Sequence, residues 1–286
     1  CQRLGIPADE TELVAWLVGN HLELSETAQK RDISDPRTVT QFANLVGSLE
    51  RLRLLYILTA ADIRAVGPGV WNAWKGQLMA DLYHNTAAAL RGGRADEAGV
   101  QAHLEGRAES RREALVEDLG SIPPVLLEME TAYWTGFDVP ELTWHATALK
   151  GSGNVVCYRF PPEGGALTLL VSGQDRAGLF ADLAGTLANL GANVVSAQVF
   201  TNRSGRIVDI FMVQDAAQKP FGQKDETRLR RLETALAETL DGASVKDLAT
   251  SRTGRRQAAF LVQPSAQIRN DVSTEYTVVD IAGRDR

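Results

Sequence analysis

The sequence predicts a helical part followed by an α+β part. Apolar residues recur at helical spacing through the first 90 residues, for example in the stretches 11–24 and 52–66. From about residue 166 the period changes, and short apolar runs alternate with amphipathic stretches. The chain has 286 residues, of which 44% are hydrophobic and 23% charged, so about two domains with buried cores are expected.

Four helices are expected before residue 91. Asp35 is predicted to cap the second of them and Pro36 to be its first residue, because proline is tolerated at that position. Trp71 and Trp74, in the fourth helix, are most simply core residues. Residues 91–118 are charged and rich in alanine, glutamate and arginine, and we expect a solvated helix there that separates two modules.

The α+β part is predicted to run strand, helix, strand, strand, helix, strand, which is the ferredoxin-like order. The turn Asn-Arg-Ser-Gly at 202–205 suits a hairpin between the two middle strands. A further strand is expected before this unit, at 155–160. The expected strands of the unit are 166–171, 193–201, 206–213 and 244–248, and its helices are 179–190 and 226–240.

A turn of sequence Gly-x-Asp-Arg occurs twice. Asp175 aligns with Asp285, 110 positions later, and the strand expected at 276–281 precedes the second turn. A second copy of the α+β unit is therefore expected to begin near the end of the chain. Since the first residue is Cys1 and the last residues fall inside the repeated motif, we expect the chain to be an internal segment of a longer protein.

The bulk composition excludes several classes of protein. A net charge of −6 argues against nucleic acid as a partner. No apolar run approaches the roughly 20 residues that span a bilayer, so no membrane partner is expected. Cys1 and Cys157 are the only cysteines, which excludes a disulfide framework and indicates the reducing cytoplasm.

Two polar residues of the helical part continue apolar stripes. His21 follows Leu13 and Leu17 at intervals of four, and Asp62 follows Leu54 and Leu58 in the same way. An imidazole and a carboxylate that converge in a bundle could bind a divalent metal, which would activate water against a phosphate ester. The alternatives are a hydrogen-bonded boundary histidine and a structural ion pair of Asp62 with Arg64.

The turn 173–178 is the candidate site of the α+β part. Gly173 and Gly178 would let a small ligand approach the backbone, the following helix would bind a carboxylate, and Asp175 would hold an ammonium group. This combination suits a free amino acid. The alternative is an ordinary loop in which Asp175 caps the helix and Arg176 is exposed. The sequence shows no catalytic serine, nucleophilic cysteine, zinc-type spacing or Walker-type loop.

Three strings together resemble the bacterial family of bifunctional uridylyltransferase/uridylyl-removing enzymes: NHLELSETAQKRDISDP at 20–36, LTAADIRAVGPGVWNAWK at 58–75 and LVSGQDRAGLF at 170–180. The resemblance covers nearly the whole chain. It implies a nucleotidyltransferase domain that uses UTP to attach UMP to the PII signalling protein, an HD domain that hydrolyses the UMP off, and two ACT domains that sense glutamine.

The resemblance also implies domain boundaries and site residues. Residues 1–118 would be the later part of an all-α HD-type domain, 119–165 a connecting segment, 166–250 the first α+β ACT domain and 256–286 the start of the second. His21 and Asp62 would be catalytic ligands of a divalent metal, Mg or Mn. The residues expected to bind glutamine are Gly173, Asp175, Arg176, Gly178, Leu179 and Asn193.

The chain departs from the family's pattern in two places. It contains no His-Asp dipeptide and no glycine-serine followed by paired aspartates. We therefore expect it by itself neither to transfer UMP nor to complete the metal site. Two other functions stay open: a non-enzymatic amino-acid-binding regulator with a degenerate helical scaffold, and an HD hydrolase that acts on a nucleotide such as an alarmone.

Overall fold

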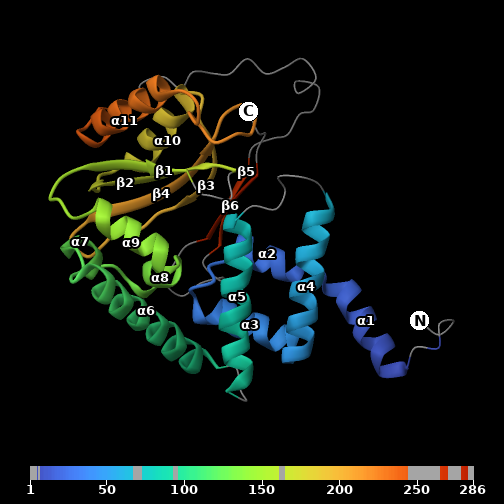
Figure 1. Cartoon of the computed structure of the whole chain (residues 1–286). Helices are drawn as coiled ribbons and strands as arrows, with labels where there is room; N and C mark the ends of the chain where they lie inside the picture. The colour runs from blue at the N-terminus through green and yellow to red at the C-terminus, as the bar shows by residue number, and fades with distance from the viewer. Residues whose placement is uncertain are drawn as a thin grey trace. The chain divides into compact units, whose positions relative to one another are not determined.

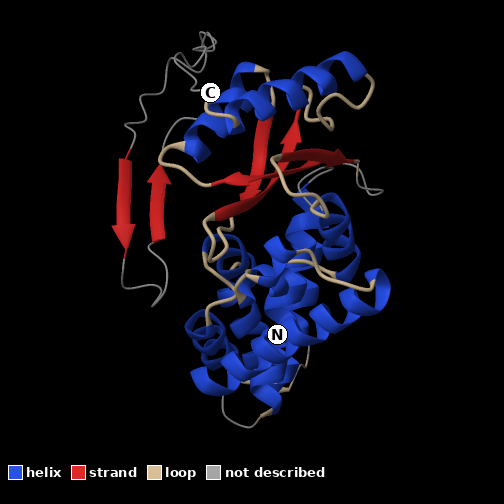
Figure 2. Ribbon diagram, turned by 90° about the vertical axis from the view of Figure 1, so that its left-hand side faces the viewer, coloured by secondary structure: helices blue, strands red, loops and turns tan. Residues whose placement is uncertain are grey.

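A computed structural model describes residues 5, 7–66, 73–92, 96–160, 165–243, 265–269 and 278–282. The chain divides into two compact units, with the boundary after residue 110. We call residues 7–110 the helical unit and residues 111–243 the sheet unit. The expectation of a helical part followed by an α+β part is confirmed (Figure 1, Figure 2). No helix in these ranges is both long enough and apolar enough to cross a membrane.

The helical unit consists of five helices and the beginning of a sixth: α1 (Ala8–Asn20), α2 (Glu23–Lys30), α3 (Pro36–Val46), α4 (Leu49–Val66), α5 (Ala73–Arg91) and α6 (Glu97–Leu119). Asp35 caps α3 as predicted, since its side chain accepts a hydrogen bond from the backbone N–H of Arg37 at 2.8 Å and Pro36 begins the helix. Trp71 and the side chain of Trp74 lie outside the described part of the chain.

Leucine side chains of α2, α4 and α5 form the centre of the helical unit. Leu24, Leu52, Leu55 and Leu82 have no exposed surface. Phe42 of α3 packs into the same cluster. The inward stripe of α4 therefore runs through Leu52 and Leu55 rather than through Leu54 and Leu58, which are only partly buried.

The helix predicted at 91–118 is present as α6, but it is not solvated on every side. Val100, Leu104, Ala108 and Leu115 are buried. They recur at intervals of four or seven, so they form a narrow apolar stripe within an otherwise charged helix.

The sheet unit contains β1 (Val155–Arg159), β2 (Leu167–Gln174), α10 (Leu179–Asn189), β3 (Asn193–Gln198), β4 (Arg206–Gln214) and α11 (Glu226–Leu240). The strands form one antiparallel sheet in the order β1-β2-β4-β3. The expected hairpin turn before β4 is present, because the backbone N–H of Gly205 donates to the carbonyl oxygen of Asn202 at 3.0 Å. The strand expected at 244–248 lies outside the described residues.

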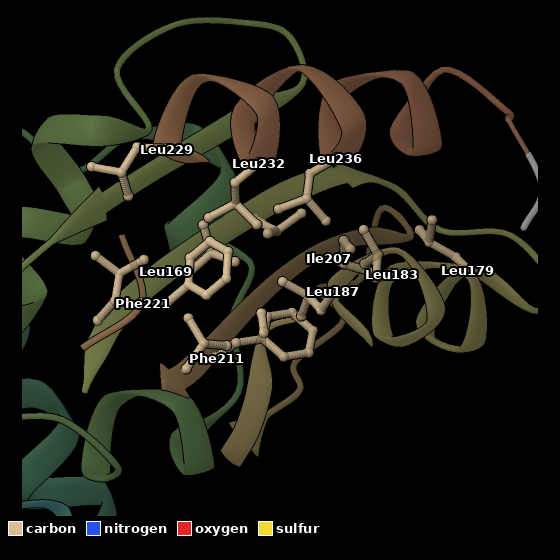
Figure 3. Packing of buried hydrophobic residues seen from close by; sticks show 14 residues of the cluster. Leu169, Leu179, Leu183, Leu187, Ile207, Phe211, Phe221, Leu229, Leu232 and Leu236 are labelled. Atoms are coloured by element: carbon tan, nitrogen blue, oxygen red, sulfur yellow. The ribbon is translucent and has the colours of Figure 1, made fainter. Parts of the chain in front are cut away.

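Helices cover one face of this sheet with leucine and phenylalanine side chains (Figure 3). Leu169 of β2 and Phe211 of β4 meet Leu183 of α10 and Leu232 and Leu236 of α11 in this core. Each of these five side chains has no exposed surface. Side chains of β2 and β4 point alternately to the two faces of the sheet, and those on this face pack against the helices.

The other face is covered by three short helices, α7 (Pro124–Leu127), α8 (Thr131–Thr135) and α9 (Val139–Ala148), shown beneath the sheet in Figure 1. Phe200, which follows β3, contacts Tyr133 and Phe137 with ring centroids 5.2 and 5.7 Å apart. Asn202 Nδ2 donates to the carbonyl oxygen of Val125 at 3.0 Å. Residues 119–160 are thus part of the packed sheet unit.

A second hairpin repeats the first. β5 (Ser265–Arg269) pairs with β6 (Val278–Ala282), and Ser265 lies opposite Ala282. In the first hairpin Val155 of β1 lies opposite Ser172 of β2. Each residue of the second pair lies 110 positions after its counterpart in the first pair. The sequence repeat therefore extends to the strand register, and it includes β1, the strand before the ferredoxin-like unit.

Candidate functional site

His21 lies in the turn between α1 and α2. Its ring Nδ1 is 2.8 Å from the backbone carbonyl oxygen of Val18. Since a carbonyl oxygen can only accept, Nδ1 donates in this contact, and in the neutral ring Nε2 is then the nitrogen that can bind a metal. Metal-binding histidines are commonly oriented in this way, with one ring N–H on a backbone carbonyl and the other nitrogen facing the metal.

A hydrogen bond joins this turn to α4. Thr59, which is buried, donates from Oγ1 to the carbonyl oxygen of His21 at 3.1 Å. Asp62 lies three residues after Thr59 and therefore on the same face of α4. Its side chain is exposed, so the inward position that the spacing of Leu54 and Leu58 predicted for Asp62 is not observed.

The described residues supply too few ligands for a complete metal site. Nowhere among them do three or more His, Cys, Asp or Glu side chains gather closely enough to hold a metal ion. His21 and Asp62 offer one imidazole nitrogen and one carboxylate, which are ligand types that divalent metals accept. A metal bound there needs further ligands from outside the described ranges.

The helical unit also has a pocket of about 260 Å³ between α4 and α5, and neither His21 nor Asp62 lines it. Its lining residues are Arg53, Tyr56, Ile57, Ala80, Tyr83 and His84. The predicted metal ligands and this pocket are therefore separate features of α4.

The second candidate site is the turn between β2 and α10. Gly178 has a φ of 79° and is the N-cap of α10, without a side-chain hydrogen bond to cap the helix. Leu179 N–H donates to the carbonyl oxygen of Arg176 at 3.1 Å, so the N–H groups that can donate to an anion at the positive end of the helix dipole are those of Phe180 and Ala181. Leu179, the first residue of α10, was predicted to bind the ligand. Its side chain is buried in the core and packs there instead.

Asp175 and Arg176 lie in the middle of this turn. Asp175 is exposed, and its backbone N–H donates to the carbonyl oxygen of Gly205 at 2.8 Å. Arg176 is partly buried, with Nη1 2.7 Å from Asp182 Oδ2 and Nη2 donating to the carbonyl oxygen of Thr239 at 3.1 Å. In contrast to the details of the ordinary-loop alternative, Asp175 does not cap α10 and Arg176 is not fully exposed.

Gly173 permits a close approach, but by the protein's own side chains. A Cβ atom at this position would lie 2.8 Å from Leu240 Cδ2 and 2.9 Å from Asn154 Oδ1. The glycine is therefore explained by packing at the end of α11 rather than by access of a ligand.

Asn193 is not brought to the turn. The turn follows Gln174, which pairs with Arg206 at the first end of β4, whereas Asn193 pairs with Gln214 at the other end. Eight steps of about 3.4 Å along β4 separate the two ends by about 27 Å. Within this chain Asn193 therefore lies far from the turn residues, and its part in binding glutamine stays a prediction.

Asp209 is a candidate that the sequence reasoning missed. It lies in β4, is 1% exposed, and its Oδ1 has no hydrogen-bond partner. Burial raises its pKa to about 7; a hydrogen bond from the backbone of Phe200 opposes this rise, and the nearby charge of Asp175 adds to it. A carboxylate inside the apolar run IVDIFMV was the signal in the sequence.

The comparisons with known proteins cover the whole chain. It is 47% identical to the bifunctional uridylyltransferase/uridylyl-removing enzyme of Caulobacter vibrioides, 45% to that of Phenylobacterium zucineum and 40% to that of Erythrobacter litoralis. Each alignment includes 100% of this chain but only 31 or 32% of the relative, so the chain spans about a third of their length. No solved structure gives a significant match.

A family model adds a local assignment. Residues 167–220 match the ACT domain, and this range contains β2, α10, β3 and β4 together with the candidate turn and Asp209. The predicted resemblance is thereby confirmed. Over its whole length the chain is homologous to part of the bifunctional uridylyltransferase/uridylyl-removing enzymes, and it contains an ACT domain.

Proposed function

We propose that the chain carries the uridylyl-removing part and the glutamine-sensing part of an enzyme that reversibly uridylylates the PII signalling protein. The observation that supports this most is the similarity of the whole chain to enzymes whose name joins the two activities. In the complete enzyme, transfer would consume UTP, and removal would release UMP from a tyrosine of PII.

In this proposal His21 and Asp62 help to bind a divalent cation, Mg or Mn. Such a cation would supply Lewis acidity and would lower the pKa of a water molecule that attacks the phosphodiester. The contact with Val18 orients His21 Nε2, and the hydrogen bond from Thr59 fixes the His21 turn against the face of α4 that carries Asp62. The remaining ligands come from elsewhere in the complete enzyme.

The ACT domain is proposed to bind glutamine at the turn 173–178. The carboxylate of glutamine would lie at the uncapped start of α10, and Asp175 would attract its ammonium group. Glutamine can regulate removal only if it binds two states of the enzyme unequally. α6 is the proposed route of coupling, because its first half belongs to the helical unit and its second half to the sheet unit.

Asp62→Asn tests the hydrolytic part in a full-length relative that carries this segment. We expect uridylyl removal to fall at least 100-fold while uridylyl transfer and the melting temperature stay unchanged, because the carboxylate is exposed and acts on the metal. Glu50→Gln, an exposed acid on the same helix, is the matched control and should leave both activities intact. Unchanged removal in Asp62→Asn would show that Asp62 is not a ligand of the metal.

A further inference from the structure

A buried carboxylate in the ACT domain has no part in the function proposed so far. Asp209 lies on the same face of β4 as Ile207 and Phe211, which belong to the core under α10 and α11. It is 1% exposed, and its Oδ1 has no hydrogen-bond partner. The backbone of Phe200 donates to this carboxyl group, but a buried oxygen left without a partner still destabilises a fold, whereas an apolar residue of similar size would simply pack. The missing partner of Oδ1 is therefore explained if a ligand binds there.

The elements around Asp209 leave it without a cation. Val171 of β2 lies opposite it, and α11 contributes leucines to this core. The charged groups near the turn include Asp175 and Arg176 of the turn and Asp182 of α10, and α11 and Arg206 of β4 carry further charges. Arg176 is engaged by Asp182 through Nη1, and the charge of Asp175 acts on Asp209 unfavourably. Two carboxylates are thus close enough to repel each other beside the start of α10.

We infer that Asp209 receives the α-ammonium group of the amino acid that binds at the turn, an inference that rests on the sensor function proposed above. An ammonium group satisfies Asp209 Oδ1 and relieves the repulsion between Asp209 and Asp175. The carboxylate of the same ligand suits the N–H groups of Phe180 and Ala181 in the first turn of α10, which has no side-chain cap. Arg176 Nε, which is buried and has no hydrogen-bond partner, is a second donor for that carboxylate.

Binding of this kind is linked to a proton. The pKa of Asp209, raised to about 7, leaves the carboxyl largely protonated at pH 6 in the free protein. An ammonium group binds the ionised carboxylate, so at pH 6 the ligand displaces the proton. Amino acids themselves do not titrate in this range, and so the proton released comes from the protein.

The test is calorimetry of the whole chain with L-glutamine at pH 5.5, 6.0 and 7.5, in buffers of different protonation enthalpy. We expect roughly 20-fold tighter binding at pH 7.5 than at pH 5.5, and release of about one proton per glutamine at pH 6.0. N-acetyl-L-glutamine, which has no ammonium group, should release no proton. Asp209→Asn should bind glutamine at least 10-fold more weakly at pH 7.5, without proton release.

Asp215→Asn is the matched control, because it makes the same change at the residue that follows β4 and should behave like the unmodified chain. If the unmodified chain takes up no glutamine at millimolar concentration, the sensor function fails and the inference fails with it. If glutamine binds without proton release and equally well to Asp209→Asn, the inference alone is overturned. Should Asp209→Asn not fold, proton release by the unmodified chain decides the matter.

Discussion

His145 and Asp209 are buried ionisable residues of the sheet unit. Their pKa shifts make the free energy of unfolding change with pH in opposite directions. Burial lowers the pKa of His145 from 6.5 to about 3, and the charge of Arg159 acts in the same direction. Its contribution to stability is present above about pH 6.5 and is lost as the pH falls, because the unfolded imidazole takes up a proton. The pKa of Asp209 is raised from 3.8 to about 7, so its contribution is present below about pH 4 and is lost as the pH rises.

These two effects should nearly cancel between about pH 4 and 6.5. Asp209→Asn removes one of them, so the free energy of unfolding of this variant should fall by about 1 kcal/mol when the pH is lowered from 6.5 to 5.5. His145→Asn should show the opposite slope. Denaturant unfolding of the sheet unit at several pH values measures both, and parallel pH profiles for the unmodified chain and Asp209→Asn would contradict the assignment.

At the scale of residues, the sequence predicted the turn 173–178 better than it predicted what surrounds the turn. Asp35, Gly178 and the hairpin turn at 202–205 follow from local backbone preferences, and a sequence displays those. Asp209 was missed because one carboxylate in an apolar strand does not show whether it faces a ligand, a partner or solvent. The distance of Asn193 from the turn could not be predicted, because it depends on strand register.

Among the elements, α6 differs most from its expected environment. Most of its surface is charged, but one side carries an apolar stripe. Arg107 links α6 to α5: Nη2 lies 2.7 Å from Asp81 Oδ1, and Nη1 donates to Asn85 Oδ1. Asp81 is 3% exposed. The sequence composition predicted a helix here but did not show the stripe, since only four of the 23 residues of α6 are apolar and buried.

Arg107→Ala should destabilise the helical unit by about 3–5 kcal/mol, because the buried Asp81 carboxylate loses the guanidinium 2.7 Å from its Oδ1. Asp81→Asn in the same chain should recover part of this loss, since it removes the charge that Arg107 faced. Denaturant unfolding of the two single variants and the double variant measures the coupling. A loss below about 1 kcal/mol in Arg107→Ala would show that the pair behaves as a surface ion pair.

The short helices α7–α9 were not predicted from the sequence. Each has four to ten residues, which is too short for a periodic apolar pattern to stand out. Their aromatic side chains are nevertheless central to the sheet unit: Tyr133 has no exposed surface, and its hydroxyl lies 3.0 Å from His145 Nδ1. Tertiary contacts with the sheet, rather than local propensity, explain these helices.

At the scale of the molecule, the order of helices and strands was largely predictable and the pairing of strands was not. The repeat of 110 positions follows from the sequence alone, because the two turns share Gly-x-Asp-Arg. The place of β1 at the edge of the sheet does not, because no local pattern specifies which strand pairs with β2. The equal register of the two hairpins extends the repeat to β5 and β6.

The central claim is that the ACT domain binds glutamine at the turn between β2 and α10. Hydrogen exchange of the whole chain, with and without saturating L-glutamine, tests it most directly because it locates the ligand without a mutation. The account predicts slower exchange in peptides that cover Gly173–Leu183 and Phe200–Asp209. Unchanged exchange in both segments, or protection confined to the helical unit, would contradict it.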